Sequence, residues 1–353
     1  MIFITGFPGF LATELMKRIV LQKPDARFLC LIQPKFQLLA EEQKTRFPAR
    51  SVQFVLGDIV EADLAIKTGV LDQPIDEIFH FAAVYDLNVA EAQALKINVT
   101  GTENMIAFAN KQSELKRFHY VSTCYVSGRH AGIFRETDLE LGQSFNNFYE
   151  STKFEAEKRV RQAMVKGLKA TIYRPAVVVG NSQTGETQKF DGPYFIMQWL
   201  LRQPGLAILP RLCHPERYTL NIVPSDFVLD AMAYLSQSER SLGKTYHLAD
   251  SQPLTIEKLI STLGKACERN VLSIPLPKAL AKFAVGSIPG LERWLGIPRS
   301  SLDYFAHPTN YSTDATQVDL AGSGIECPKF STYAGVLVQF MKTHPELRSR
   351  ALI

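Results

Sequence analysis

A tyrosine and a lysine four positions apart are the first residues of this chain that could do chemistry. Tyr149 and Lys153 open a charged, helix-forming stretch, and side chains at this spacing share one helical face, about 5–6 Å apart at Cβ. An ammonium group there favours the phenolate, so we expect the pKa of Tyr149 to fall from roughly 10 toward neutrality. Such a tyrosine can donate a proton to a carbonyl oxygen. The spacing is also common on amphipathic helices and needs support from elsewhere.

That support comes from an upstream strand that ends in hydroxyl groups. The run 119–126 reads as a strand, and it carries Thr123 where the strand ends. Its Oγ1 would be a second hydrogen-bond donor to the oxygen on which negative charge develops as hydride arrives. We therefore predict a catalytic set of Thr123, Tyr149 and Lys153.

A glycine-containing turn at the start of the chain predicts the elements that must hold a cofactor. An apolar run from Met1 to Ile4 reads as a buried strand, and a helical pattern follows directly. Gly6 would permit the sharp turn, Gly9 would let the backbone approach a pyrophosphate, and Ala12 would let the helix pack closely. An ordinary glycine turn is the alternative, because this pattern alone is weak evidence. The predicted cofactor contacts here are Thr5, Gly6, Phe7, Pro8, Gly9, Phe10 and Leu11.

The next strand ends bear on which dinucleotide is bound. A strand over 27–32 ends at Gln33, where an acidic residue would bind the ribose hydroxyls of NAD, and Lys35 follows. A missing acid and a nearby cation favour NADP over NAD, although NADH is not excluded and Lys35 also reads as a solvated loop residue. After the third strand, Asp58 could accept from the adenine amino group or simply cap a turn, and Ile59 beside it is a further predicted cofactor contact. Small residues after the fourth strand, Ala82 and Ala83, would let the cofactor lie against the backbone.

Composition narrows the class of protein. The 353 residues are 46% hydrophobic and 21% charged, as in ordinary globular proteins, and the net charge of +4 does not indicate nucleic acid as a partner. Five scattered cysteines without a Cys-x-x-Cys pair predict reduced thiols in a cytoplasmic protein, with no metal site. We see no run long enough to span a membrane and no room for a signal peptide before the turn.

The region from 273 to 297 stops alternating strands and helices. Apolar residues recur there at helical intervals between prolines, which predicts short bent helices. We expect them to form a lipid-facing lid over the active site, with possible peripheral contact to a membrane, while the alternative is that they pack the core of a small cap. The apolar positions are Leu276, Leu280, Phe283, Ala284, Ile288, Leu291, Trp294 and Leu295.

Together these residues resemble the extended short-chain dehydrogenase/reductase superfamily, in its fatty acyl-CoA reductase (male-sterility, thioester-reductase) branch. The chain looks most like the N-terminal reductase half of two-domain bacterial fatty acyl-CoA reductases. Besides the glycine turn and the Thr-Tyr-Lys set, the stretches that carry the likeness are 81–86, 173–175 with Gly180, 184–186, 191–194, 220–227 and 331–334. Two departures are Gln33, where many relatives carry an arginine, and an end near residue 353, which leaves out the second reductase domain.

The resemblance implies an α/β fold with a Rossmann-type doubly wound parallel sheet and a smaller, mostly helical C-terminal substrate domain. The dinucleotide-binding domain would comprise 1–180 and about 219–250, and the substrate-binding cap 181–218 and 251–353. It further implies that Tyr149 and Lys153 also touch the cofactor. Further implied cofactor contacts are Tyr173, Pro175, Ala176 and Val177.

The predicted function is NADPH-dependent reduction of a long-chain acyl thioester, carried by CoA or acyl carrier protein, to the fatty aldehyde. Onward reduction to the alcohol, chain length and oligomeric state are left open. An alternative with the same residues is a reductase or dehydrogenase of a fatty aldehyde, lipid ketone or sterol-like alcohol. A sugar-nucleotide epimerase or dehydratase is disfavoured, because Cys124 and Tyr125 stand where dehydratases carry their Asp-Glu pair. A non-catalytic dinucleotide sensor would be expected to lack Tyr149 or Lys153.

Overall fold

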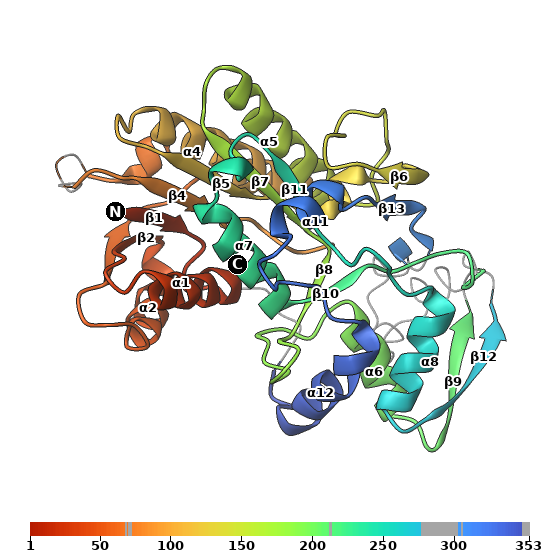
Figure 1. The fold of residues 1–353 in the computed structure, drawn as a ribbon. Helices are drawn as coiled ribbons and strands as arrows, with labels where there is room; N and C mark the ends of the chain where they lie inside the picture. The colour runs from red at the N-terminus through yellow and green to blue at the C-terminus, as the bar shows by residue number, and fades with distance from the viewer. Residues whose placement is uncertain (68, 70–72, 212–213, 277–302, 305, 348–353) are drawn as a thin grey trace.

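The protein forms two lobes that meet along the edge where the central sheet ends (Figure 1). The computed structural model describes residues 1–67, 69, 73–211, 214–276, 303–304 and 306–347. Most of the predicted lid, including Phe283 and Trp294, lies outside these ranges. Within them, no helix is both long and apolar enough to cross a bilayer.

The larger lobe is built on a seven-stranded parallel sheet, which confirms the predicted Rossmann-type fold. The strand order is β11-β7-β5-β4-β1-β2-β3, so the order reverses between β1 and β4. Ile2 of β1 is in register with Phe28 on one side and Glu77 on the other. The strands are β1 (Ile2–Thr5), β2 (Phe28–Ile32), β3 (Val52–Leu56), β4 (Glu77–His80), β5 (Arg117–Val121), β7 (Ala170–Pro175) and β11 (Thr245–Leu248).

Helices cover both faces of this sheet because its strands are apolar on both sides. Ile2 and Ile4 pack with α1 and α7, whereas Phe3 between them faces Met105 and Val160 on α4 and α5. The helices of this lobe are α1 (Phe10–Gln22), α2 (Gln37–Lys44), α3 (Glu91–Ala94), α4 (Gly101–Asn110), α5 (Phe148–Val165) and α7 (Ser225–Gln237). Shorter turns are η1 (Pro34–Phe36), η2 (Ala62–Ala65), η4 (Cys124–Ser127), η5 (Glu239–Ser241) and the wider π-helical η3 (Leu95–Thr100).

The smaller lobe has its own apolar core, in which Tyr194, Met197, Leu259 and Leu337 are all buried. Among the described residues, three helices and a parallel ribbon of two strands build it, and a second strand pair joins it to the sheet lobe (Figure 1). Its elements are α6 (Pro193–Leu201), β9 (Leu206–Arg211), α8 (Ile256–Ala266), β12 (Asn270–Pro275) and α12 (Phe330–Thr343). The joining pair is β8 (Val177–Val179) and β10 (Ile222–Pro224).

One late segment differs from the predicted division of the chain. Residues 251–353 were all expected in the cap, but β13 (Thr309–Tyr311) pairs with β6 (Gly132–Phe134) of the sheet lobe. The next helix, α11 (Asp314–Leu320), packs beside β11 and α7. The buried carboxylate of Glu136 holds it there, because it accepts hydrogen bonds from the N–H groups of Ala315 and Thr316 and from the Thr316 hydroxyl. The chain therefore returns from the cap to the sheet.

Candidate active site

The turn after β1 has no room for a side chain at either of its two glycines. Gly6 has a φ of +90°, and a Cβ there would lie 2.7 Å from Cβ of Phe81. At Gly9 the obstacle is local, since a Cβ would come within 2.7 Å of the Gly6 carbonyl oxygen. The turn therefore folds back tightly on itself and packs against the residues that follow β4. Phe10 and Leu11 begin α1 directly beyond it.

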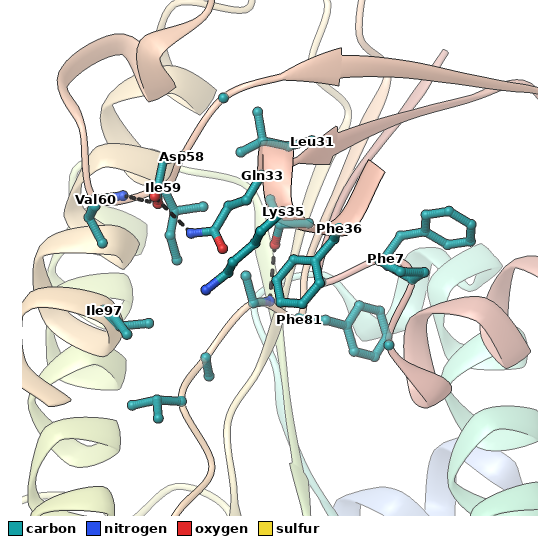
Figure 2. Close-up of a pocket in the computed structure, with 18 of the residues that line it drawn as sticks. Phe7, Leu31, Gln33, Lys35, Phe36, Asp58, Ile59, Val60, Phe81 and Ile97 are labelled. Carbon is teal, nitrogen blue, oxygen red and sulfur yellow. Dashed lines mark hydrogen bonds between the residues drawn. The ribbon is translucent and has the colours of Figure 1, made fainter. Parts of the chain in front are cut away.

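A cavity of about 300 Å³ opens at this turn (Figure 2). It lies at the carboxyl ends of the strands on either side of the point where strand order reverses, which is where doubly wound sheets bind nucleotides. Glycines that let the backbone approach, the N-terminus of α1 without a side-chain cap and the small residues after β4 suit a pyrophosphate and its ribose. The residues present thus fit a nicotinamide dinucleotide. The lining residues are Thr5, Gly6, Phe7, Pro8, Gly9, Leu31, Gln33, Lys35, Phe36, Gly57, Asp58, Ile59, Val60, Phe81, Ala82, Ala83, Val84, Gln93 and Ile97.

Gln33 and Asp58 line the end of this cavity where the adenosine is predicted to bind (Figure 2). The Gln33 side-chain amide donates to Asp58 Oδ2 at 2.7 Å, and the other Asp58 oxygen accepts from the Val60 N–H at 3.1 Å. Asp58 therefore does cap a turn, as the alternative interpretation had it, and it also lines the cavity. The exposed Lys35 ammonium lies 4.9 Å from the centre of the Phe36 ring, where it is free of any carboxylate partner among the described residues.

A chain of buried hydrogen bonds runs behind the cavity, and sequence reasoning did not detect it. The Thr5 hydroxyl contacts His80 Nδ1 at 2.8 Å and also accepts from the Ala82 N–H. The other His80 nitrogen lies 3.1 Å from the Thr102 hydroxyl, which donates to the Asn98 carbonyl. Burial and, to a smaller extent, the charge of Lys153 lower the pKa of His80 to about 3, so this histidine is neutral.

Asn98 connects the cavity to the helix that carries the predicted catalytic pair. Its side chain accepts from the Val84 N–H at 2.9 Å and donates to the Thr152 hydroxyl at 3.0 Å. Val84 lines the cavity, and Thr152 precedes Lys153. The cofactor turn, the cavity wall and α5 thus belong to one buried hydrogen-bonded unit.

Tyr149 and Thr123 meet beside Tyr85, the residue that follows Val84 of the cavity wall. Asn147 caps α5 by accepting from the Glu150 N–H, which puts Tyr149 in the first turn. The ring of Tyr149 packs edge-on against Tyr85, with centroids 5.0 Å apart. Burial raises the pKa of Tyr149 well above its usual value, and a side-chain hydrogen bond with Thr123 works against this shift. Tyr149 is therefore protonated and hydrogen-bonded to Thr123.

The predicted effect of Lys153 on Tyr149 is wrong for this structure. The lysine is on the expected helix, but its Nζ donates to the Val121 carbonyl at 2.8 Å and lies 4.5 Å from the centre of the Tyr120 ring. Burial lowers the pKa of Lys153 to about 7, with Glu157 opposing the shift. The desolvation of Tyr149 therefore outweighs any stabilisation of its phenolate by the lysine.

A buried ion pair one turn along α5 locks this arrangement, and sequence reasoning missed its role. The Glu157 carboxylate accepts from the Arg174 guanidinium at 2.6 Å and from the Ser122 hydroxyl at 2.6 Å, with both charged side chains fully buried. Burial alone would raise the pKa of Glu157. The charge of Arg174 and, to a smaller extent, its hydrogen bonds to the carboxylate instead hold that pKa at about 2. Because Ser122 precedes Thr123, the pair fixes α5 to both β5 and β7. The stretch 173–175 contributed to the family resemblance, but no sequence spacing pointed to Glu157.

The structure does not bring every predicted cofactor contact to the cavity. Tyr173 is fully buried in the sheet, where its hydroxyl lies 3.1 Å from His119 Nδ1. Pro175 and Ala176 lie where β7 ends, and the Pro175 carbonyl accepts from the Thr123 hydroxyl at 3.5 Å. The backbone of Pro175 therefore adjoins Thr123, Val177 begins β8, and the Tyr173 ring packs within the sheet.

The family is settled by comparison with known proteins. A family model described as male sterility protein matches residues 4–232, which is more than half of the chain. The chain belongs to this family. Membership puts it among the NAD(P)H-dependent oxidoreductases of the extended short-chain dehydrogenase/reductase superfamily, and so confirms the predicted thioester-reductase branch.

The curated proteins to which this chain is similar include reductases and peptide synthetases. The chain is 27% identical to a linear gramicidin synthase of Brevibacillus parabrevis, over 96% of this chain and 7% of that protein. It is 27% identical to fatty acyl-CoA reductase 2, chloroplastic, of Arabidopsis thaliana, over 48% of this chain and 32% of that protein. It also resembles the crystal structure of the terminal R domain from the myxalamid PKS-NRPS pathway, with a TM-score of 0.82, 26% identity and coverage of 98% and 91%. The chain thus spans a minor part of both curated relatives.

Proposed function

We propose that this chain reduces a long-chain acyl thioester to the aldehyde, with NADPH as the hydride source. The observation that carries the proposal is a buried, protonated Tyr149 that is hydrogen-bonded to Thr123 and packs on Tyr85, the residue after Val84 of the cavity wall. When bound, the nicotinamide supplies hydride. Thr5 to Gly9 would hold the pyrophosphate, and Lys153 the nicotinamide ribose.

The reducing step needs a proton at the carbonyl oxygen. As hydride adds to the thioester carbon, Tyr149 would donate its proton to the oxygen while the Thr123 hydroxyl stabilises the developing charge. The raised pKa of Tyr149 suits this role, because it keeps the phenol protonated until the oxygen becomes basic. The hemithioacetal then returns its hydroxyl proton to Tyr149 as the C–S bond breaks. Aldehyde leaves, and the departing thiolate takes one proton from solvent.

The side chains beside Thr123 argue against the elimination chemistry of a dehydratase. Cys124 and Tyr125 are both buried, and burial raises the pKa of each above its usual range. Neither can exchange protons with a substrate as an Asp-Glu pair would. Reduction of a fatty aldehyde remains the second candidate, because it uses the same proton donor and the same hydride.

We propose NADPH over NADH on the basis of Lys35. Its ammonium is at the mouth of the cavity, and Gln33, where NAD enzymes carry an acid, bears no charge that would repel a 2′-phosphate. The proposed carrier is CoA or acyl carrier protein. Related proteins that bear on this choice are a thiolation-reductase di-domain from an archaeal non-ribosomal peptide synthetase and alcohol-forming fatty acyl-CoA reductase of Simmondsia chinensis.

The test is NADPH oxidation with a series of acyl-CoA thioesters and with the matching aldehydes, using the purified chain and Tyr149→Phe. Wild type should consume NADPH with the thioesters and release aldehyde. Tyr149→Phe should lose about 100-fold or more in kcat while its Kd for NADPH stays within a few-fold. A variant that keeps more than about a tenth of the rate, or a wild type inactive on every thioester, would contradict the proposal.

A further inference from the structure

A loop of the smaller lobe brings an ion pair beside Tyr85, whose ring packs against Tyr149. Between β8 and α6, Lys189 Nζ lies 3.0 Å from Asp191 Oδ2, and the two side chains are 22% and 18% exposed. Phe190 between them is 1% exposed and packs on Tyr194. Because the central ring is anchored in the apolar core of the cap, the flanking charges have to turn toward the active site.

Tyr85 connects this pair to the catalytic tyrosine. The Lys189 ammonium lies 4.7 Å from the centre of the Tyr85 ring, and the same ring contacts Tyr149 edge-on at 5.0 Å. The charge of Asp191 is close enough to contribute to the raised pKa of Tyr149. Asp191, Lys189, Tyr85 and Tyr149 thus form a continuous row that leads away from the proton donor.

The loop that carries the pair is held in place at its base. Asp226 at the start of α7 accepts hydrogen bonds from the Ser182 N–H at 2.7 Å and from the Ser182 hydroxyl at 2.6 Å. The Gly180 N–H donates to the Tyr194 hydroxyl at 2.9 Å. Lys189 and Asp191 are therefore presented by an ordered segment.

Partial burial of this ion pair costs free energy of desolvation. Burial raises the pKa of Asp191, although Lys189 acts to lower it. Taking charges out of water is often repaid only in part by their mutual attraction, and a loop open to solvent could have kept both hydrated. An ammonium beside a carboxylate offers a hydrogen-bond donor and an acceptor side by side, which complements the C=O and N–H of an amide.

We propose that Tyr85, Lys189 and Asp191 form a subsite for an amide of the pantetheine arm that carries the acyl group. This inference rests on the proposed function, because it concerns the thiol half of a thioester substrate. Only two methylene groups separate the pantetheine sulfur from the first amide nitrogen, so an amide falls about one ring's width from a carbonyl held at Tyr149. An aldehyde has no such arm, and the subsite therefore favours thioester over aldehyde.

The experiment compares two thioesters of the same fatty acid, one with pantetheine and one with ethanethiol. Both present the same acyl chain and the same carbonyl, and only the first has amides. Wild type should show a kcat/KM at least about tenfold higher for the pantetheine thioester, since hydrogen bonds to charged groups are worth this much or more. Lys189→Met and Asp191→Asn should bring the ratio of the two values toward one. Lys189→Arg, which keeps a donor, should retain most of it.

The ratio separates recognition from a structural or electrostatic role. Removing the Asp191 charge also alters Tyr149, but this changes both substrates alike and cancels in the ratio. Lys158→Met, which breaks an exposed ion pair with Glu140 on the far side of α5, is the matched control and should keep the wild-type ratio.

Three results would overturn the subsite. They are equal kcat/KM values for the two thioesters with wild type, an unchanged ratio in both Lys189→Met and Asp191→Asn, or the same change in Lys158→Met. If both variants fail to fold, the wild-type ratio alone decides. The proposed function fails in a different way, through reduction of the aldehyde with neither thioester reduced.

Discussion

Replacing Glu157 by Gln should destabilise the protein far more than a single surface charge would. The substitution keeps the shape of the side chain but removes the negative charge that faces Arg174, and both groups are fully buried. Removing one partner of a buried pair leaves the other charge uncompensated, at a cost of about 3–5 kcal/mol. A typical domain is stable by only about 5–15 kcal/mol, so the loss would be a large part of the total.

Urea unfolding followed by circular dichroism measures this loss. Glu140→Gln is the matched control, because it makes the same change in an exposed ion pair. The partner of Glu140 is Lys158, which lies on α5 as Glu157 does, and exposed ion pairs contribute little to the free energy of unfolding. Restoring balance with Glu157→Gln plus Arg174→Met should recover part of the stability. If Glu157→Gln loses no more than about 1 kcal/mol, or no more than Glu140→Gln, the ion pair does not fix α5 as argued.

The single variant Glu157→Gln should also change the pH dependence of turnover. Glu157 supports the charged form of Lys153, whose pKa burial lowers to about 7. Lys153 is charged below its pKa, so activity that needs the ammonium should decline as the pH rises through about 7. Without Glu157 that pKa falls further, and the decline should begin at lower pH. A pH profile identical to wild type would show that Glu157 does not act on Lys153.

Two further predictions concern the cofactor and acid stability. Lys35→Glu should raise the KM for NADPH and leave that for NADH nearly unchanged, and a wild type that prefers NADH would contradict the assigned role. Burial lowers the pKa of His80, His247 and His307 from 6.5 to about 3, so the unfolded chain binds more protons between these values. Stability should therefore fall as the pH drops below about 6.5, by up to about 1.4 kcal/mol per pH unit for each histidine. Urea midpoints that stay flat from pH 7 to pH 5 would refute this reasoning.

Local pattern was enough to predict most of the sheet lobe. The strands 52–56 and 245–248 were predicted to the residue, because short runs rich in apolar and aromatic residues stand between turn residues there. The turn after β1 was also predicted, although Gly9 is required by the Gly6 carbonyl and not only by room for a pyrophosphate.

What the sequence did not reveal depends on burial and on contacts between distant residues. The spacing of Tyr149 and Lys153 was read as an electrostatic pair, but desolvation decides the pKa of both groups. His80 and Glu157 looked like ordinary strand and helix residues, since their partners come from other elements. The return of 309–320 to the sheet lobe was missed for the same reason, because β13 is short and its partner β6 lies far back in the chain.

The return of α11 to the sheet lobe limits how this protein can be divided or recombined. A fragment that stopped near residue 250 would keep all seven strands yet leave the Glu136 carboxylate buried without the N–H groups that it now caps. It would also leave the Tyr246 hydroxyl without Asp319, its acceptor at 2.6 Å. The nucleotide-binding half is therefore discontinuous along the gene. A chimaera that exchanges the cap with a relative needs junctions both before β13 and after α11, because α12 belongs to the smaller lobe again. Such a chimaera would swap substrate preference while β13 and α11, which complete the sheet lobe, stay native.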